Sequence, residues 1–345
     1  MRYNPVVIVL LLCWTACKKQ PEPPIADSSE PIAVEIEEEV AMVLAPLDAQ
    51  LPVVSWGEVW AYIVDGREPT VRQDIPISDL AYFGATVDTY GTLVGAPDRN
   101  KLSWFQGRVH IVVTCESRAL THFALEEGSA TRKQLISDLL MATEPFDGLQ
   151  IDFEQVPARD RQAFRSFLRE LQAGIGDKML SVALPARLRS INDDVYDYRS
   201  IAGIVDRVLV MAYDEHWSGS EPGPIASLVW CKRIADYAFS TIGHEKLIMG
   251  LPFYGRAWGF NPNNAYIYSR IEQLKSENGV SAIEYKNGIP TFSYSVPVTV
   301  TVYYEDAYSL INRLQIYKEQ NINAVGFWRL GQEDPRFWTL IRLEE

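Results

Sequence analysis

The stretch Asp147-Gly148-Leu149-Gln150-Ile151-Asp152-Phe153-Glu154 decides how the rest of the chain is interpreted. It has the composition of a β-strand, along which successive side chains point to opposite faces. One face is apolar and the other polar: Leu149, Ile151 and Phe153 against Gln150, Asp152 and Glu154. Strands buried in a parallel sheet are apolar on both faces, so three polar side chains in register are costly to bury without partners or a function. An edge strand with one face in water is the alternative.

Composition narrows the class of protein. The 345 residues are enough for one large domain or two ordinary ones, and 47% apolar residues allow a sizeable core. The formal net charge of −13 argues against nucleic acid or an anionic membrane surface as the partner. The cysteines and histidines show no metal-ligand spacing, so we predict neither a metal site nor a cofactor. Cys115 and Cys231 are far apart in sequence, and we expect two separate buried thiols.

The first 50 residues resemble an export segment followed by a linker. Residues 1–16 combine Arg2 with the apolar run Pro5–Leu12, which is too short to span a bilayer, and we predict a signal peptide. Small residues directly before Cys17 resemble a bacterial lipobox, in which that thiol carries lipid after cleavage; an ordinary secretory leader is the alternative. Residues 17–50 are acidic and proline-rich, which predicts a flexible linker. We therefore expect an exported protein, either a lipoprotein of the bacterial envelope or a secreted one.

Apolar runs and helical patterns alternate from Val53 onward. The apolar spacing from Phe164 to Leu171, ended by Gly174, predicts a helix. Such segments separate eight short runs that we interpret as strands: Val59–Val64, Asp79–Gly84, Val109–Thr114, Gly148–Phe153, Leu180–Leu184, Arg207–Tyr213, Lys246–Leu251 and Ala324–Trp328. This alternation predicts an α/β fold, a (β/α)8 TIM barrel over residues 51–345. A doubly wound open sheet is the alternative, but the chain has no glycine-rich phosphate-binding motif.

One segment interrupts the alternation. Residues 258–304, between the seventh and eighth predicted strands, contain a helical stretch at Ile271–Glu277 and several short strand-like runs. Asn287-Gly288 is typical of a two-residue hairpin turn. We therefore predict a small α+β insertion on the rim of the barrel, at about residues 258–304.

Functional side chains of such a barrel belong at the carboxyl ends of its strands. There, strand four would end in Asp152 and Glu154, and strand six leads into Met211–Trp217. Strand seven leads into Leu251–Arg256, and strand eight ends at Trp328. Carboxylates and aromatic rings at one mouth suit a sugar, because aromatic faces stack on pyranose rings while acids act on the glycosidic oxygen. The sequence therefore predicts a carbohydrate-binding cleft.

Four motifs, in this order, resemble those of glycoside hydrolase family 18. Asp147–Glu154 is similar to the DGxDxDxE signature of that family with one position changed, and Met211–Asp214, Pro252–Arg256 and Trp328 match further family motifs. The resemblance covers residues 53–345. It is greatest for the spore-germination and cortex-lytic branch, whose members share the run Met-Ala-Tyr-Asp-Glu-His.

The resemblance implies hydrolysis of β-linked N-acetylglucosamine glycan without a protein nucleophile, because the substrate's own N-acetyl carbonyl attacks the anomeric carbon. Glu154 would be the general acid and base, while Asp152 and Tyr213 would hold the acetamido group. With about 7 Å between the Cα atoms of Asp152 and Glu154 on one strand, each charge should raise the proton affinity of the other. Further residues implied to bind substrate are Gln150, Met211, Asp214, Trp217, Tyr254, Arg256 and Trp328.

Gln150 stands where many family 18 chitinases carry a third aspartate. An amide cannot ionise, but Gln150 can still form a hydrogen bond with Asp152, and we interpret it as a mark of the branch. We expect a monomer that binds an N-acetylglucosamine-containing polysaccharide, with cell-wall peptidoglycan the first candidate and chitin the second. A lectin-like protein that binds sugar without hydrolysis is the alternative, although such members typically lack the acid that Glu154 supplies.

Overall fold

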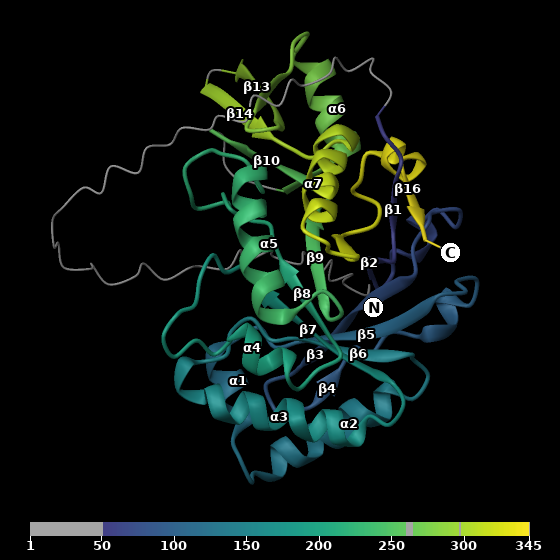
Figure 1. The fold of residues 1–345 in the computed structure, drawn as a ribbon, viewed down its shortest axis with the longest axis vertical. Coiled ribbons are helices and arrows are strands. Elements are labelled where there is room, and N and C mark those ends of the chain that lie inside the picture. Colours follow the sequence, from purple (N-terminus) through teal and green to yellow (C-terminus); the bar gives the residue numbers. More distant parts are fainter. Residues whose placement is uncertain (1–50, 260–264, 297, 345) are drawn as a thin grey trace, which may run out of the picture.

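The computed structural model describes residues 51–259, 265–296 and 298–344 (Figure 1). The segments predicted as signal peptide and linker, including Cys17, lie outside these residues. Eight parallel strands form the central sheet, in the order β2 (Glu58–Val64), β15 (Ala324–Trp328), β9 (Leu247–Pro252), β8 (Arg207–Met211), β7 (Met179–Pro185), β6 (Gly148–Asp152), β5 (Arg108–Thr114) and β3 (Asp79–Val87). β3 also pairs with β2, so the sheet closes into a barrel. The predicted TIM barrel and all eight predicted strands are confirmed.

Helices surround the barrel: α1 (Arg118–Leu125), α2 (Ala130–Thr143), α3 (Arg161–Gly174), α4 (Tyr198–Ala202), α5 (Leu228–Ile242) and α7 (Ala307–Glu319). The predicted helical spacing is confirmed in α3, whose Phe164, Phe167, Leu168 and Leu171 are buried. The first two connections are exceptions. Residues 65–78 contain only the 3-10 turn η1 (Glu68–Thr70), and residues 88–107 contain the short strand β4 (Leu93–Val94) and the turn η2 (Arg99–Leu102).

The first and last strands of the domain pair with each other. β1 (Val54–Trp56) pairs in parallel with β16 (Ile341–Leu343), outside the barrel (Figure 1). The turn η4 (Pro335–Thr339) precedes β16, and its Phe337 and Trp338 are buried. Cys115 and Cys231 are separate buried thiols, as predicted.

The two faces of β6 lie in different surroundings, one in the apolar core outside the barrel strands and one inside the barrel. Leu149, Ile151 and Phe153 pack in the large apolar core between the strands and the surrounding helices. Gln150 and Asp152 point the other way and are also buried. The polar face of this strand therefore lies inside the barrel, and the edge-strand alternative is wrong.

The amino end of the barrel is closed by a buried ionic cluster. Asp79 accepts hydrogen bonds from Arg108 Nε (2.7 Å) and from Ser78 Oγ (2.7 Å), and its Oδ1 lies 2.8 Å from His110 Nε2. The His110 ring stacks on Trp60 with 4.3 Å between ring centroids. Polar residues at this end of a barrel contribute to stability rather than to chemistry.

The insertion forms a separate layer at one end of the barrel (Figure 1). Its antiparallel sheet consists of β10 (Tyr254–Trp258), β11 (Ala265–Ile267), β12 (Glu284–Lys286), β13 (Ile289–Val296) and β14 (Val298–Tyr303), with α6 (Tyr268–Glu277) beside it. The predicted boundary at about residue 258 must be moved to Tyr254. The barrel strand β9 ends at Pro252, Phe253 stacks on Phe327 with 4.7 Å between centroids, and the chain enters the insertion sheet at the next residue.

Asn287 and Gly288 form the predicted hairpin turn between β12 and β13, with φ angles of 53° and 78°. We expect Gly288→Ala to lower the free energy of unfolding by about 2 kcal/mol. A Cβ at this position is strained by the backbone and would lie 2.3 Å from Cδ1 of Leu228 in α5. Gly279→Ala is the matched control, because Gly279 also has a positive φ of 63° but no atom within 4 Å of the added carbon. Denaturant unfolding of both variants checks this, and equal losses would show that the contact with α5 is unimportant.

Candidate active site

Asp152 is the last residue of β6 and is buried at the carboxyl end of the barrel. Glu154 lies two residues further on, in the turn after the strand, and is exposed. The expectation that both carboxylates lie on one strand is therefore wrong, because β6 ends before Glu154. The result is one carboxylate inside the barrel and one at its mouth.

The Asp152 carboxyl group is electrostatically unusual. Burial, and then the nearby charge of Glu154, raise its pKa well above the ordinary value. Its Oδ1 has no hydrogen-bond partner among the described residues. A buried carboxyl group in this state favours its proton, and it can donate a hydrogen bond to a polar group placed beside it.

The side-chain amide of Gln150 forms its hydrogen bonds with residues of other strands. Its Oε1 accepts a short hydrogen bond from the Tyr62 hydroxyl group, and its Nε2 donates to Ser181 Oγ at 3.2 Å. The hydrogen bond that Gln150 could have formed with Asp152 is not present among the described residues. The amide instead bridges β2 and β7 across the inside of the barrel.

Asp214 forms hydrogen bonds with two side chains of β10. Its Oδ1 accepts hydrogen bonds from the Tyr254 hydroxyl group (2.6 Å) and from Arg256 Nε (3.2 Å) and Nη2 (2.9 Å). Asp214 has a φ of 61°, a conformation that aspartate tolerates better than most residues. The structure thus joins the predicted motifs after β8 and β9.

Tyr213 lies between this group and the carboxylates. Its ring is 6.4 Å from that of Tyr254, centroid to centroid, and nearly perpendicular to it. Burial raises the pKa of Tyr213 well above the ordinary value, and the charges of Tyr62, Tyr254, Asp152 and Glu154 raise it further. The hydroxyl group therefore stays neutral and is available as a hydrogen-bond donor.

Trp328 ends β15 and is half-buried. Its ring lies 5.2 Å from that of Tyr62 and 5.1 Å from that of Phe83, between centroids. Met211 packs in the same cluster inside the barrel. An aromatic ring partly exposed at the end of a barrel strand can form the floor of a sugar subsite.

The second half of the Met211–Trp217 run has mainly local contacts. Glu215 accepts hydrogen bonds from the backbone nitrogen (2.7 Å) and the hydroxyl group (3.1 Å) of Ser227, the N-cap residue of α5. His216 Nδ1 lies 2.8 Å from the carbonyl oxygen of Pro224. The Trp217 backbone nitrogen donates to Ser220 Oγ at 3.0 Å. These contacts fold the loop before α5, and the hydrogen bond from Trp217 stays within this loop rather than reaching Asp152 or Glu154.

Because Glu215 supports the start of α5, we expect Glu215→Ala to lower the free energy of unfolding by about 1–2 kcal/mol. Turnover should change little, since this carboxylate is engaged by Ser227. Glu221→Ala, in the same loop and exposed, is the control and should leave stability within about 0.5 kcal/mol. Denaturant unfolding and initial rates check both statements; a loss of turnover without a loss of stability would instead place Glu215 in the chemistry.

Three residues of the site were not predicted: Tyr62, Phe83 and Ser181. All lie on barrel strands, and Tyr62 and Ser181 reach Gln150 from strands far away in sequence. The signal available in the sequence was a polar or aromatic residue within an otherwise apolar strand.

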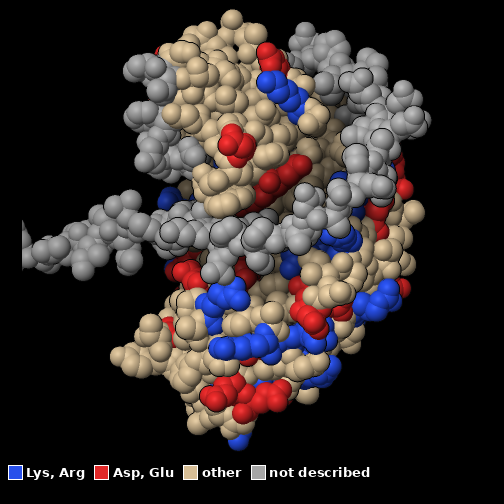
Figure 2. Space-filling model, turned by 90° about the vertical axis from the view of Figure 1, so that its left-hand side faces the viewer, with Lys and Arg blue, Asp and Glu red and all other residues tan. Residues whose placement is uncertain are grey.

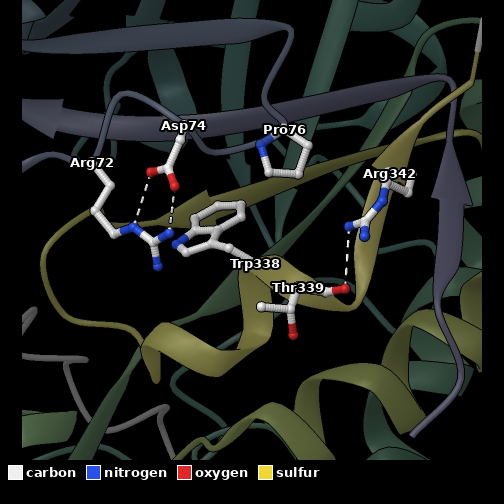
Figure 3. Close-up of a pocket in the computed structure, with 6 residues that line it drawn as sticks. All are labelled: Arg72, Asp74, Pro76, Trp338, Thr339 and Arg342. Carbon is white, nitrogen blue, oxygen red and sulfur yellow. Dashed lines mark hydrogen bonds and ion pairs between the residues drawn. The ribbon is translucent and has the colours of Figure 1, made fainter.

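A cavity of about 360 Å³ lies elsewhere, between the segment after β2 and the end of the chain (Figure 3). It is lined by Arg72, Asp74, Pro76, Trp338, Thr339 and Arg342. Arg72 donates to Asp74, and Arg342 donates to the carbonyl oxygens of Thr339 and Ile341. None of the residues predicted for the site lines this cavity.

Charge is unevenly distributed on the face shown in Figure 2. Acidic side chains lie in a recess between the upper and lower halves of the molecule in this view, and most basic side chains in view lie on the lower half.

Within the described part of the chain, no three His, Cys, Asp or Glu side chains are placed to hold a metal ion. The helices described there include none that is long and apolar enough to cross a membrane.

Known proteins provide an independent comparison. The uncharacterized glycosylase YvbX of Bacillus subtilis (strain 168) is 32% identical over 227 residues, which cover 61% of this chain and 66% of that protein. The cortical fragment-lytic enzyme of Bacillus anthracis is 27% identical over 287 residues, 76% of this chain and 66% of that protein. The chain spans about half to two thirds of the length of the curated relatives that it matches.

Solved structures agree with these relatives. The spore cortex-lytic enzyme SleL of Bacillus cereus superposes with a TM-score of 0.74 and 25% identity, over 86% of this chain and 76% of that one. The family model described as glycosyl hydrolases family 18 matches residues 121–333, more than half of the chain. The chain therefore belongs to glycosyl hydrolase family 18.

Proposed function

We propose that the protein is a glycosidase that hydrolyses β-linked N-acetylglucosamine-containing glycan by substrate-assisted, retaining catalysis. The observation that carries the proposal is the placement of Asp152, buried without a partner for its Oδ1 among the described residues, two residues before an exposed Glu154 at the mouth of the barrel. One carboxyl group is suited to holding a polar substituent, and the other to exchanging protons with a bound substrate.

In the first step, Glu154 donates its proton to the glycosidic oxygen as the bond to the anomeric carbon breaks. The carbonyl oxygen of the substrate's own acetamido group bonds to that carbon and forms an oxazolinium ion. Asp152 and Tyr213 orient the acetamido group, and the Asp152 carboxylate would stabilise the positive charge. In the second step, Glu154 takes a proton from water, whose oxygen attacks the anomeric carbon and reopens the ring. The two displacements retain the configuration.

Trp328 would support the sugar from below, and Tyr254, Arg256 and Asp214 would line the wall of the pocket. Met211, with Gln150 beneath, would shape its inner end. The arrangement is consistent with these roles, because Arg256 is buried while the Asp214 side chain remains 40% exposed and can meet a ligand.

Peptidoglycan is the substrate favoured by the name of the cortical fragment-lytic relative, and chitin is the second candidate. Mass analysis of products from both glycans, side by side, tests the proposal. New N-acetylglucosamine reducing ends from peptidoglycan would support it, and products from chitin alone would change the substrate. Tight sugar binding with no new reducing ends would favour the lectin-like alternative.

We also propose that the protein is exported and anchored to a bacterial envelope membrane through lipid on Cys17, with residues 17–50 as the linker and the folded domain acting as a monomer. The proposal rests on the sequence of the first 50 residues. Metabolic labelling with a fatty acid tests it: the wild type should be labelled and Cys17→Ser should not.

A further inference from the structure

Two arginines follow neighbouring strands at the mouth of the barrel. Arg67 comes after β2 and Arg329 after β15, and these strands pair in parallel. Within the described residues, neither guanidinium group forms an ion pair with a carboxylate. Three basic side chains near the carboxyl ends of strands are paired, by contrast: Arg256 with Asp214, Arg187 with Asp194, and Lys101 with Asp65.

The backbone around both arginines is fixed. The Leu330 nitrogen donates to the carbonyl oxygen of Tyr62 at 2.9 Å. The carbonyl oxygen of Arg67 accepts hydrogen bonds from Thr70, from its nitrogen at 3.0 Å and its hydroxyl group at 2.7 Å. A carbon added at Gly331 would lie 3.2 Å from that hydroxyl oxygen. The segment after β15 therefore packs on the turn after β2, next to Trp328 in the chain.

Arg329 is partly buried beside a like charge. Burial, and then the charge of Arg67, lower the pKa of Arg329, whereas Glu333 acts in the opposite direction. Among the described residues Glu333 forms no ion pair with Arg329; its oxygens accept hydrogen bonds from the Gln332 nitrogen (2.9 Å) and from Trp338 Nε1 (3.1 Å). Because the backbones that carry the two arginines pack on each other, one anion that binds both guanidinium groups would offset this like charge.

We propose that Arg67 and Arg329 form an anion subsite beside Trp328 that binds a carboxylate carried by the glycan. The inference deepens the proposed function and rests on it. Chitin is uncharged, whereas peptidoglycan carries carboxylates on the lactyl ether of its muramic acid or on its peptides. The subsite thus selects an acidic glycan over a neutral one, although the protein itself carries a formal net charge of −13.

Binding measured by calorimetry tests the subsite without relying on turnover. Three ligands are compared: a neutral N-acetylglucosamine oligomer, glycan strands freed of peptide that expose lactyl carboxylates, and the same strands with these carboxylates amidated. Strands that keep their peptides form a fourth arm, in which only peptide carboxylates are free. The wild type should bind an acidic ligand about tenfold more tightly than the amidated strands. The arm in which this preference appears identifies which carboxylate is bound.

Arg329→Gln should abolish the preference and leave affinity for the neutral oligomer within about twofold. Arg67→Gln should have the smaller effect, because Arg67 is exposed. Arg329→Lys should recover part of the preference, since it restores the charge. Arg72→Gln is the matched control, because Arg72 is already paired with Asp74 and should leave the preference unchanged.

Equal weakening of all ligands by Arg329→Gln would show a structural role and overturn the proposal, as would an unchanged preference. A wild type that binds acidic and neutral strands equally overturns it as well. Failure of the proposed function has a different signature, namely that no glycan yields new reducing ends whatever its charge.

Discussion

Glu154→Gln is expected to reduce turnover of an N-acetylglucosamine oligomer by about 1000-fold. The amide has the same size as the carboxyl group but cannot donate a proton to the departing oxygen or take one from water. Glu154 lies exposed in a turn, so the free energy of unfolding should change by no more than about 0.5 kcal/mol. Reducing-end assays and denaturant unfolding measure the two quantities.

Glu116→Gln provides a matched control for this variant. Glu116 is also exposed and lies two residues beyond the end of the neighbouring strand β5. If position alone mattered, both variants would lose activity; we expect the control to stay within about threefold of the wild type. Unchanged turnover in Glu154→Gln would remove Glu154 from the mechanism and with it the proposed function.

Asp152→Asn is expected to reduce turnover by about 100-fold, because the asparagine cannot become the charge that stabilises the oxazolinium ion. The stability of the variant relative to the wild type should increase as pH rises. The folded-state pKa of Asp152 is raised above the unfolded value of about 3.9, so the folded protein binds this proton more tightly. The wild type therefore loses stability as pH rises from about 4 through the folded pKa, whereas the variant lacks this contribution.

Melting temperatures of the wild type and of Asp152→Asn between pH 4 and pH 8 measure this effect. The difference between them should shift in favour of the variant as pH rises. A difference that does not depend on pH would contradict the inference that burial disfavours the Asp152 carboxylate. Gln150→Glu is a useful companion, because it adds an ionisable group two residues from Asp152 on the same strand.

The barrel was predictable because its strands are short apolar runs separated by turn residues, and because their number matches a closed barrel. The two connections without α-helices show the limit of this argument. Residues 65–78 and 88–107 contain 3-10 turns or a hairpin where a helix was the simplest expectation. Propensity gives little information about irregular segments that are held by packing.

Long-range contacts explain the remaining differences at the site. Gln150 is able to form a hydrogen bond with its near neighbour Asp152, but the partners of its amide lie 88 and 31 residues away in sequence. Strand alternation placed Glu154 on the same face as Asp152, yet it could not show that β6 ends at Asp152. Motif spacing identifies which residues meet at the mouth, whereas their hydrogen bonds depend on side chains from other strands.

Because β1 pairs with β16, the first and last strands of the domain are neighbours, and a circular permutation of the domain can be designed. The two strands run in parallel, so a peptide that joins residue 344 to residue 51 must run back along the pair over roughly 20 Å, which about eight residues can span. New ends could then be opened at the exposed Tyr90, in the tip between β3 and β4. The order in which the strands are synthesised would change, while the barrel and the carboxyl groups of Asp152 and Glu154 would keep their neighbours.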